Sequence, residues 1–426
     1  MEPSDLLNMK YMATLLFAAA VIHTFAAPQF NKWAGRFRPG SIGENLFHFL
    51  GEVEVVFGIW ATVLIVIWSM LHGTASAISF LESLNYTEAV FVFVIMCMAA
   101  TKPVLDYSRR AIQSLSHGIP GPGATSLYVM TLIAGPLLGS IITEPASMTL
   151  TAILLKDTFF GPQVSLKFKY ATLGLLFVNV SIGGTLTNFA APPVLMVAGP
   201  WGWDTGFMLK HFGPKVLPAV ILSTLLTAYF FRHELARLEI SKPSPEFNSR
   251  PPFWVFIVQA AFMAMTILQS HHIVFMIPVF LIFLGWCQVT REFQDELKIK
   301  ESLLVAFFLG GLVTLGKLQD WWLQPTLASL EPKTLFFGSL GLTAFTDNAA
   351  LTYLGTLVPT LTPDAKYFLL AGAVSGGGLT VIANAPNPAG NSLLKDSFGE
   401  NGISPLGLFL AALPYTILIG ILFIFL

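Results

Sequence analysis

Long apolar runs separated by short polar segments make up most of this chain. At roughly 20 apolar residues per membrane crossing, the pattern predicts an all-α polytopic membrane protein. Its ten expected crossings lie near residues 10–28, 46–71, 88–106, 168–198, 214–231, 253–270, 272–289, 302–323, 366–387 and 404–426.

Two further apolar stretches, 124–156 and 335–360, are too long for one helix and are interrupted at Thr143 and Thr346. Their arms of about 14 to 17 residues fall short of a full crossing. Irregular backbone at membrane depth is tolerated where protein surrounds it. We therefore expect each stretch to form a re-entrant hairpin, which enters and leaves on the same side.

The polar run 232–252 divides the chain into two similar halves. Residues 1–231 hold five expected crossings and the first hairpin, and residues 253–426 hold five crossings and the second. An odd number of crossings gives the halves opposite orientations in the membrane. The pattern therefore predicts two inverted-topology repeats joined by a cytoplasmic linker.

Composition supports the membrane class. The chain is 54% hydrophobic and 11% charged, with a mean hydropathy of +0.70, against roughly 25% charged residues in ordinary soluble domains. Its net charge of −1 gives no sign of a nucleic-acid-binding surface. The expected surroundings are a lipid bilayer.

Loop charge predicts the orientation. With ten crossings and two hairpins, most of the 23 Lys and Arg residues fall on one side, and the positive-inside rule makes that side cytoplasmic. We expect a multi-pass protein of the cell inner (plasma) membrane with both termini outside.

The interruptions of the two hairpins have similar sequences. Residues 143–149 read TEPASMT and residues 346–352 read TDNAALT, so Glu144 and Asp347 each stand second in a similar frame. An ionised carboxylate near the bilayer middle costs several kcal/mol, so a proton or Na⁺ is expected to bind it. Nearby oxygen ligands for a hard cation are Thr143, Thr346 and Asn348. The alternative is that each carboxylate caps the second hairpin helix.

Glycine-rich breaks followed by proline occur once in each half, in SIGGTLTNFAAPP (181–193) and SGGGLTVIANAPNP (375–388). Unwound backbone in a transporter commonly lines an ion site, although glycines also serve close helix packing. The residues expected to break the helices are Gly183, Gly184, Pro192, Pro193, Gly376, Gly377, Gly378 and Pro386. The polar residues between them, expected to contribute cation ligands, are Thr185, Thr187, Asn188, Thr380, Asn384 and Asn387.

Glu52 and Glu54 begin an apolar span and, being two apart, point to different faces. At most one of them can face a cavity. Because His48 stands four residues before Glu52, we expect Glu52 to be the one with a partner.

These motifs resemble the ion transporter superfamily, which includes sodium/proton antiporters, arsenite-efflux permeases and divalent-anion sodium symporters. FTDNAALT (345–352) resembles the Asp-Asn hairpin motif of the antiporter and arsenite branches. GGTLTNFAAPP (183–193) resembles their Gly-Gly-Thr-x-Thr-Asn-x-x-x-Pro-Pro element. Within the superfamily the chain most resembles a bacterial family of Na⁺/H⁺ antiporters. The resemblance implies two hairpins, two interrupted helices and a cation site between the hairpin tips.

The resulting hypothesis is a secondary transporter that exchanges H⁺ for Na⁺ or Li⁺, with Asp347 holding the proton and the cation in turn. An ion-coupled carrier of organic acids or oxyanions with the same fold is the alternative. An intramembrane enzyme is disfavoured because no HExxH, GxSxG or convergent His set occurs. We expect no cofactor and no metal other than transported Na⁺, and a homodimer is compatible with the sequence.

Overall fold

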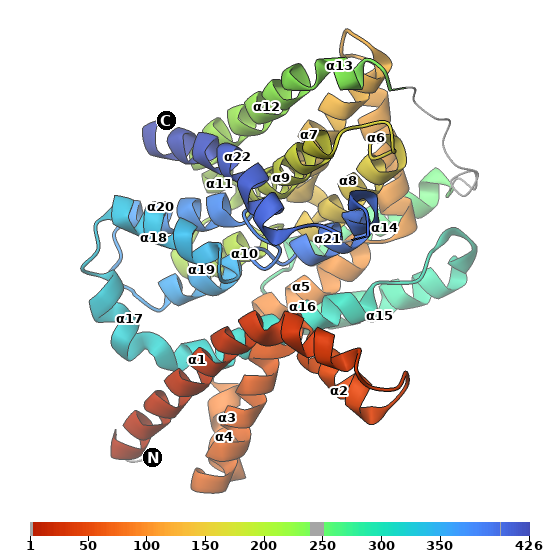
Figure 1. The fold of residues 1–426 in the computed structure, drawn as a ribbon. Helices are drawn as coiled ribbons and strands as arrows, with labels where there is room; N and C mark the ends of the chain where they lie inside the picture. Colours follow the sequence, from red (N-terminus) through yellow and green to blue (C-terminus); the bar gives the residue numbers. More distant parts are fainter. Residues whose placement is uncertain (1–2, 239–250, 401) are drawn as a thin grey trace.

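A computed structural model describes residues 3–238, 251–400 and 402–426, and this part of the chain contains helices and loops but no strand. The expected linker 232–252 lies mostly outside the described residues. Its first residues form α13 (Arg232–Leu235). Both chain ends lie toward the left of Figure 1, whereas α13 lies toward the upper right.

The N-terminal half contains these helices: α1 (Pro3–Ala34), α2 (Ile42–Leu50), α3 (Val56–His72), α4 (Thr74–Glu82), α5 (Thr87–Ala99), α6 (Lys102–Ser116), α7 (Gly123–Ile142), α8 (Glu144–Thr158), α9 (Leu166–Gly183), α10 (Pro192–Trp201), α11 (Thr205–His211) and α12 (Gly213–Phe230). Short 3₁₀ turns lie at Val53–Val55 and Gly184–Leu186.

The C-terminal half contains α14 (Phe253–Leu268), α15 (Ile273–Val289), α16 (Ile299–Gly316), α17 (Asp320–Leu327), α18 (Pro332–Thr343), α19 (Asn348–Thr356), α20 (Pro363–Gly376), α21 (Asn387–Leu394) and α22 (Pro405–Phe425). Short 3₁₀ turns also occur at Arg291–Phe293, Lys317–Gln319 and Lys395–Phe398.

Six helices of the described residues are long and apolar enough to cross a membrane, or seven if α4 and α5, bent by 66°, count as one span. Other expected crossings are shorter apolar helices, such as α14 and α15, or helices interrupted by the glycine-rich breaks. The protein is therefore an all-helical polytopic membrane protein, and the count of ten crossings stays a prediction.

Both hairpin stretches are broken where the sequence predicted. Thr143 separates α7 from α8, and residues 344–347 separate α18 from α19. The expected arm length was wrong for the first hairpin. Its first arm, α7, has 20 residues and is long enough to cross, because the helix continues through Pro136. The arms nevertheless run antiparallel, because the earlier Gly135 lies beside the later Thr151 and the later Gly139 lies beside the earlier Ser147. A Cβ on Gly135 would collide with Thr151 Oγ1, and one on Gly139 would lie 3.2 Å from Ser147 Cβ.

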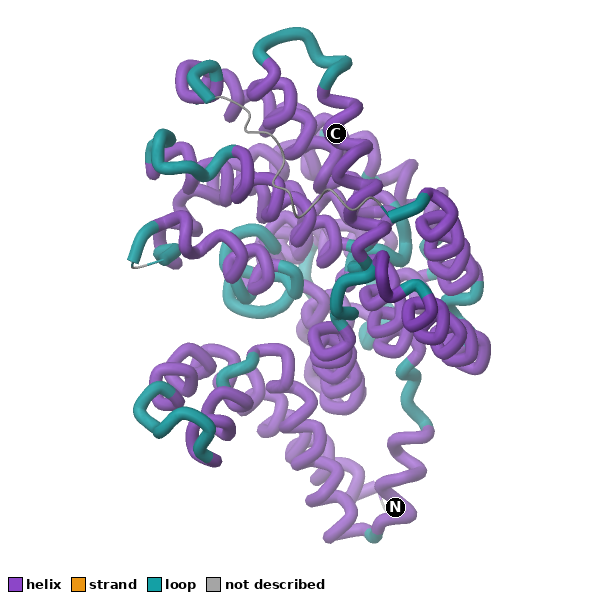
Figure 2. Tube along the Cα trace, turned by 90° about the vertical axis from the view of Figure 1, so that its right-hand side faces the viewer, coloured by secondary structure: helices purple, strands orange, loops and turns teal. Residues whose placement is uncertain are grey.

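The helices form two groups (Figure 1). The group at the bottom of the view contains α1 to α4, and α5 and α16 lie between it and the hairpins and broken helices. Figure 2, turned by 90°, again shows the N-terminal helices at one end. One apolar core joins α1, α3, α5 and α16, and further cores join α7, α8, α9 and α22. The second group contains the hairpins and the two broken helices, α9 with α10 and α20 with α21. Protein there surrounds the irregular backbone of the breaks.

Candidate ion site

The first hairpin packs beside the first broken helix, with α7 and α9 parallel. Going along both helices, Tyr128 Oη lies 2.8 Å from Thr172 Oγ1, and Asn179 Nδ2 donates to Leu132 O at 3.1 Å. Near the break, Ser140 Oγ donates to Gly183 O at 2.6 Å. The end of α7 is therefore held directly against the unwound segment that follows Gly183.

The two halves share a set of contacts at their breaks. Thr187 Oγ1 donates to Ser140 O at 2.8 Å, and Thr380 Oγ1 donates to Ala344 O at 2.9 Å. In both halves, then, a threonine after the glycines donates a hydrogen bond to the C-terminal end of the first hairpin arm.

A second pair of contacts joins each hairpin tip to the loop after the break. Glu144 N donates to Ala190 O at 3.3 Å, and Asn348 N donates to Ala383 O at 3.1 Å. Glu144 thus corresponds to Asn348. The sequence frame, which paired Glu144 with Asp347, was wrong by one residue.

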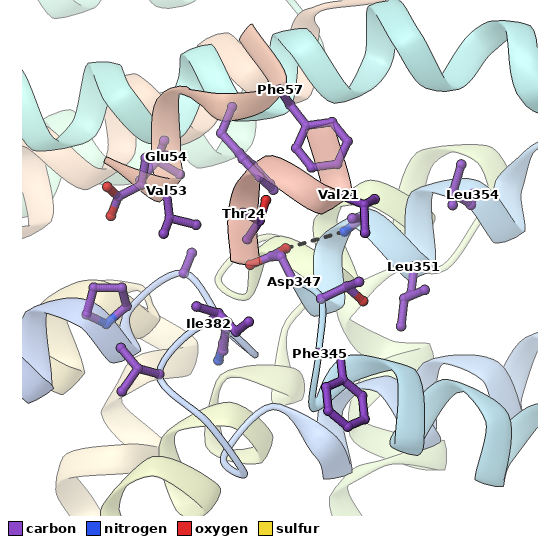
Figure 3. A pocket seen from close by; sticks show the side chains of 18 of the residues that line it. Val21, Thr24, Val53, Glu54, Phe57, Phe345, Asp347, Leu351, Leu354 and Ile382 are labelled. Atoms are coloured by element: carbon purple, nitrogen blue, oxygen red, sulfur yellow. Dashed lines mark hydrogen bonds between the residues drawn. The ribbon is translucent and has the colours of Figure 1, made fainter. Parts of the chain in front are cut away.

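Asp347 is the N-cap of α19, and it corresponds in position to Thr143, the N-cap of α8. Its Oδ1 accepts from Ala349 N at 2.8 Å and from Ala350 N at 3.3 Å. Figure 3 shows the other carboxylate oxygen pointing away from α19 into the space between Thr24 and Ile382. One oxygen therefore caps the helix while the other faces a cavity, so the capping role leaves a ligand atom available.

This cavity has an empty volume of about 740 Å³, including its mouth. Its polar lining comes from Thr24, Glu54, Thr346, Asp347 and Asn384, and the rest is mostly apolar. No Lys, Arg or His occurs among the described residues that line it. A cavity with two carboxylates and no basic side chain suits a cation.

Of the two neighbouring acids Glu52 and Glu54, the cavity is lined by Glu54, although the sequence pattern favoured Glu52. Glu54 lies in the 3₁₀ turn Val53–Val55 before α3 and lines the cavity, and Figure 3 shows its carboxylate pointing away from Asp347. Glu52 is exposed and does not line the cavity, and His48 lies 3.9 Å from Glu44 instead. The expectation for Glu52 was wrong because a spacing of two residues does not specify which of the two side chains points inward. The 3₁₀ turn Val53–Val55 places Glu54 at the cavity.

Glu144 does not cap α8, whose N-cap Thr143 makes no side-chain cap hydrogen bond. The Glu144 side chain is fully buried, and its Oε2 accepts from Asn384 Nδ2 at 3.1 Å. Its Oε1 is buried without a hydrogen-bond partner. Gly184 makes room for it, since a Cβ there would lie 2.6 Å from Oε1. Asn384 therefore links Glu144 to the cavity that Asp347 faces.

Several more buried polar atoms around the breaks lack partners. Both amide atoms of Asn348 are unpartnered, and so are Asn384 Oδ1, Asn387 Oδ1 and Thr143 Oγ1. Buried polar groups are nearly always hydrogen-bonded, so a cluster of exceptions calls for a water, an ion or a functional role. Asn348 is close to the second break, because its Nδ2 lies 2.8 Å from where a Cβ of Gly377 would be.

The other predicted ligands are divided between backbone contacts and a separate cavity. Thr185 Oγ1 donates to Ile182 O at 2.6 Å, and Thr346 Oγ1 donates to Leu342 O at 3.0 Å. Asn387 Nδ2 donates to Gly377 O and Thr380 O at 2.7 and 2.8 Å. Asn188 accepts from Thr205 and lines a different, smaller cavity. The structure therefore gathers Asp347, Thr346, Asn384, Glu144 and Asn348, and it separates Asn188 from them.

The predicted glycines and prolines mark the breaks. A Cβ on Gly183 would lie 2.5 Å from Pro136 O, and one on Gly376 would lie 2.5 Å from Leu340 O. A Cβ on Gly378 would collide with the backbone of Val178. Pro192 and Pro193 begin α10, and Pro386 is the N-cap of α21. The glycines thus serve close packing as well as unwinding.

The apolar spans and broken helices are consistent with a polytopic membrane transporter. The chain belongs to the family described as "Putative Na+/H+ antiporter", whose model matches residues 8–426. No curated protein matches the sequence. Among solved structures, the chain is similar to the YdaH transporter of Alcanivorax borkumensis, with 14% identity, a TM-score of 0.48, and 87% of this chain and 96% of that chain covered.

Proposed function

We propose that this chain is a cation/proton antiporter that exchanges H⁺ for Na⁺ or Li⁺ across the inner membrane. Asp347 holds the proton and the cation in turn. The observation that carries the proposal is the placement of Asp347, whose free oxygen faces a cavity without basic side chains. An ionised carboxylate away from bulk water is costly, so a proton and a cation compete for it.

Neutral oxygens complete the site in this proposal. Asn384 lies between the cavity and Glu144, and its Oδ1 has no partner. Thr346 lines the same cavity, and Glu144 and Asn348 add unpartnered atoms behind it. Hard monovalent cations take such oxygen ligands. Glu144 acts as a second acidic station, reached through Asn384.

Electrostatics favours a cation over the anion alternative. A helix N-terminus attracts anions through its free N–H groups and its dipole. At α19 two of these N–H groups are occupied by the carboxylate of Asp347, which also supplies negative charge. An organic acid or oxyanion would meet two carboxylates in the cavity and no basic side chain.

The proposal includes two inverted repeats, 1–231 and 253–426, with the linker in the cytoplasm and both termini outside. The support is the recurrence of the Thr187 and Thr380 contacts and of the Glu144 and Asn348 contacts. The loop charges favour this orientation. A homodimer is compatible with this arrangement.

The test is cation-induced collapse of a proton gradient in vesicles that contain the purified protein. We expect Na⁺ or Li⁺ to discharge the gradient with the wild type and with Asp364→Asn, an exposed acid in the first turn of α20. Asp347→Asn is expected to abolish the response. Glu144→Gln is expected to slow it at least about tenfold, because about 1.4 kcal/mol of lost binding is a factor of ten.

Two outcomes would overturn the proposal. If Asp347→Asn responds like the wild type, Asp347 is only a helix cap. If no cation acts on the wild type and carboxylates or oxyanions discharge the gradient instead, the chain is an anion carrier of the same fold.

A further inference from the structure

A second, smaller cavity lies between the start of α5, the segment around α10 and the turn between α14 and α15. It has an empty volume of about 300 Å³, including open solvent at its mouth, and its polar lining comes from Glu88, Asn188, Ser270 and His271. Glu88 is in the first turn of α5, and His271 is in the turn between α14 and α15. Nothing in the site described above uses these residues.

The two cavities occupy corresponding places in the two halves. Thr187 and Thr380 make the same contact with the end of the first hairpin arm. When the two halves are aligned so that Thr187 corresponds to Thr380, Asn188 corresponds to Val381, Phe189 to Ile382 and Leu195 to Pro388. The first of each pair lines the small cavity, and the second lines the Asp347 cavity.

The cavities also lie toward opposite ends of the expected crossings. Thr24 and Glu54, in the wall of the Asp347 cavity, flank the loop that holds Lys32, Arg36 and Arg38, on the side with most of the positive charge. Glu88 begins its crossing and His271 lies in the turn between two others, and neither connecting segment contains Lys or Arg. Under the proposed orientation, the Asp347 cavity faces the cytoplasm and the small one faces outward.

We propose that the small cavity is the outer station of the transport path and that it receives a monovalent cation or a proton. This inference rests on the proposed function. Glu88 supplies the charge, with its Oε1 lying 3.6 Å from where a Cβ of Gly199 in α10 would be. Asn188 is held by Thr205 Oγ1, which donates to Asn188 Oδ1 at 2.8 Å.

Sidedness of thiol labelling tests this path. In a background with the buried Cys97 and Cys287 changed to Ala, Phe189→Cys and its counterpart Ile382→Cys are treated with a membrane-impermeant thiol reagent. Right-side-out and inside-out vesicles are compared, with and without Na⁺. Ser83→Cys, an exposed position after α4, reports labelling from outside.

We expect Phe189→Cys to react in right-side-out vesicles and Ile382→Cys in inside-out vesicles, with Na⁺ changing both rates. The inference is overturned if Ser83→Cys reacts from outside while Phe189→Cys reacts only from inside, or from neither side under either ion condition.

A kinetic variant tests the charge at the outer station. Glu88→Gln is expected to raise the KM for external Na⁺ about fivefold, as for the loss of about 1 kcal/mol, and to leave the KM for internal Na⁺ unchanged. Glu82→Gln, an exposed acid in α4, is the matched control. An equal change of both KM values, or no change, contradicts the assignment.

These results are separable from the function itself. External labelling of Phe189→Cys without any cation response supports the outer cavity as part of the transport path and refutes cation exchange. A cation response without external labelling supports cation exchange and refutes the outer cavity as part of the path.

Discussion

Asn384 donates a hydrogen bond from Nδ2 to Glu144 Oε2 at 3.1 Å, across 240 residues of sequence. It joins the loop after the second break to the tip of the first hairpin, and both side chains are buried. The two halves of the protein therefore meet at a polar contact beside the cavity that Asp347 faces.

The first prediction concerns this contact. Asn384→Ala removes the donor and leaves a buried carboxylate without its partner, so we expect a loss of about 1–3 kcal/mol in the free energy of unfolding. Glu144→Gln keeps an acceptor oxygen and is expected to cost less. Denaturant unfolding in detergent of both variants and of the double variant gives a coupling energy. A coupling near zero would mean that the negative charge of Glu144 adds nothing to its contact with Asn384.

The second prediction separates the two roles of Asp347. Asn and Asp are similar N-caps, so Asp347→Asn should unfold like the wild type while losing cation exchange. Asp347→Ala should lose exchange and also about 1 kcal/mol of stability. Thermal or denaturant unfolding beside vesicle assays checks both. Normal exchange by Asp347→Asn would leave capping as the only role of this residue.

The third prediction concerns the close approach of the broken helices to the hairpins. Gly183→Ala and Gly376→Ala place a Cβ 2.5 Å from a backbone oxygen, which a flexible side chain cannot relieve. We expect each to lower the free energy of unfolding by about 1–3 kcal/mol. Gly338→Ala in α18, where a Cβ meets nothing within 4 Å, is the control and should be neutral or slightly stabilising. Equal stability of all three variants would refute the packing argument.

The fourth prediction concerns Thr143, the one described residue other than glycine with positive φ, at 74°. A β-branched residue in this region stores roughly 1–3 kcal/mol of strain. Its Oγ1 is buried without a partner, so little is lost when the side chain is removed. Thr143→Gly should therefore raise the free energy of unfolding, whereas Thr143→Val should not. Unfolding curves of both variants decide, and a less stable Thr143→Gly would show that the side chain itself matters.

Several features of the site follow from residue types along the chain. Thr143 and residues 344–347 interrupt the hairpins, and the glycine-rich segments interrupt the helices, as their residue types indicate. Asp347 stands out because a carboxylate inside an apolar run is costly and therefore rarely accidental. Residue types do not give the alignment between the two hairpins. The similar sequences TEP and TDN pair Thr143 with Thr346, whereas the structure pairs Thr143 with Asp347, since each is the N-cap of the second hairpin helix.

The sequence by itself determined the membrane class, the breaks and the candidate acids, because hydropathy, glycine and proline act locally along the chain. Only the tertiary structure decided that Glu54 lines the cavity, that Asn384 binds Glu144 and that Asn188 belongs to another cavity. These relations depend on how helices distant in sequence pack and on which way a short 3₁₀ turn points. No local pattern specifies such contacts, since the same residue spacing fits more than one arrangement of neighbouring helices.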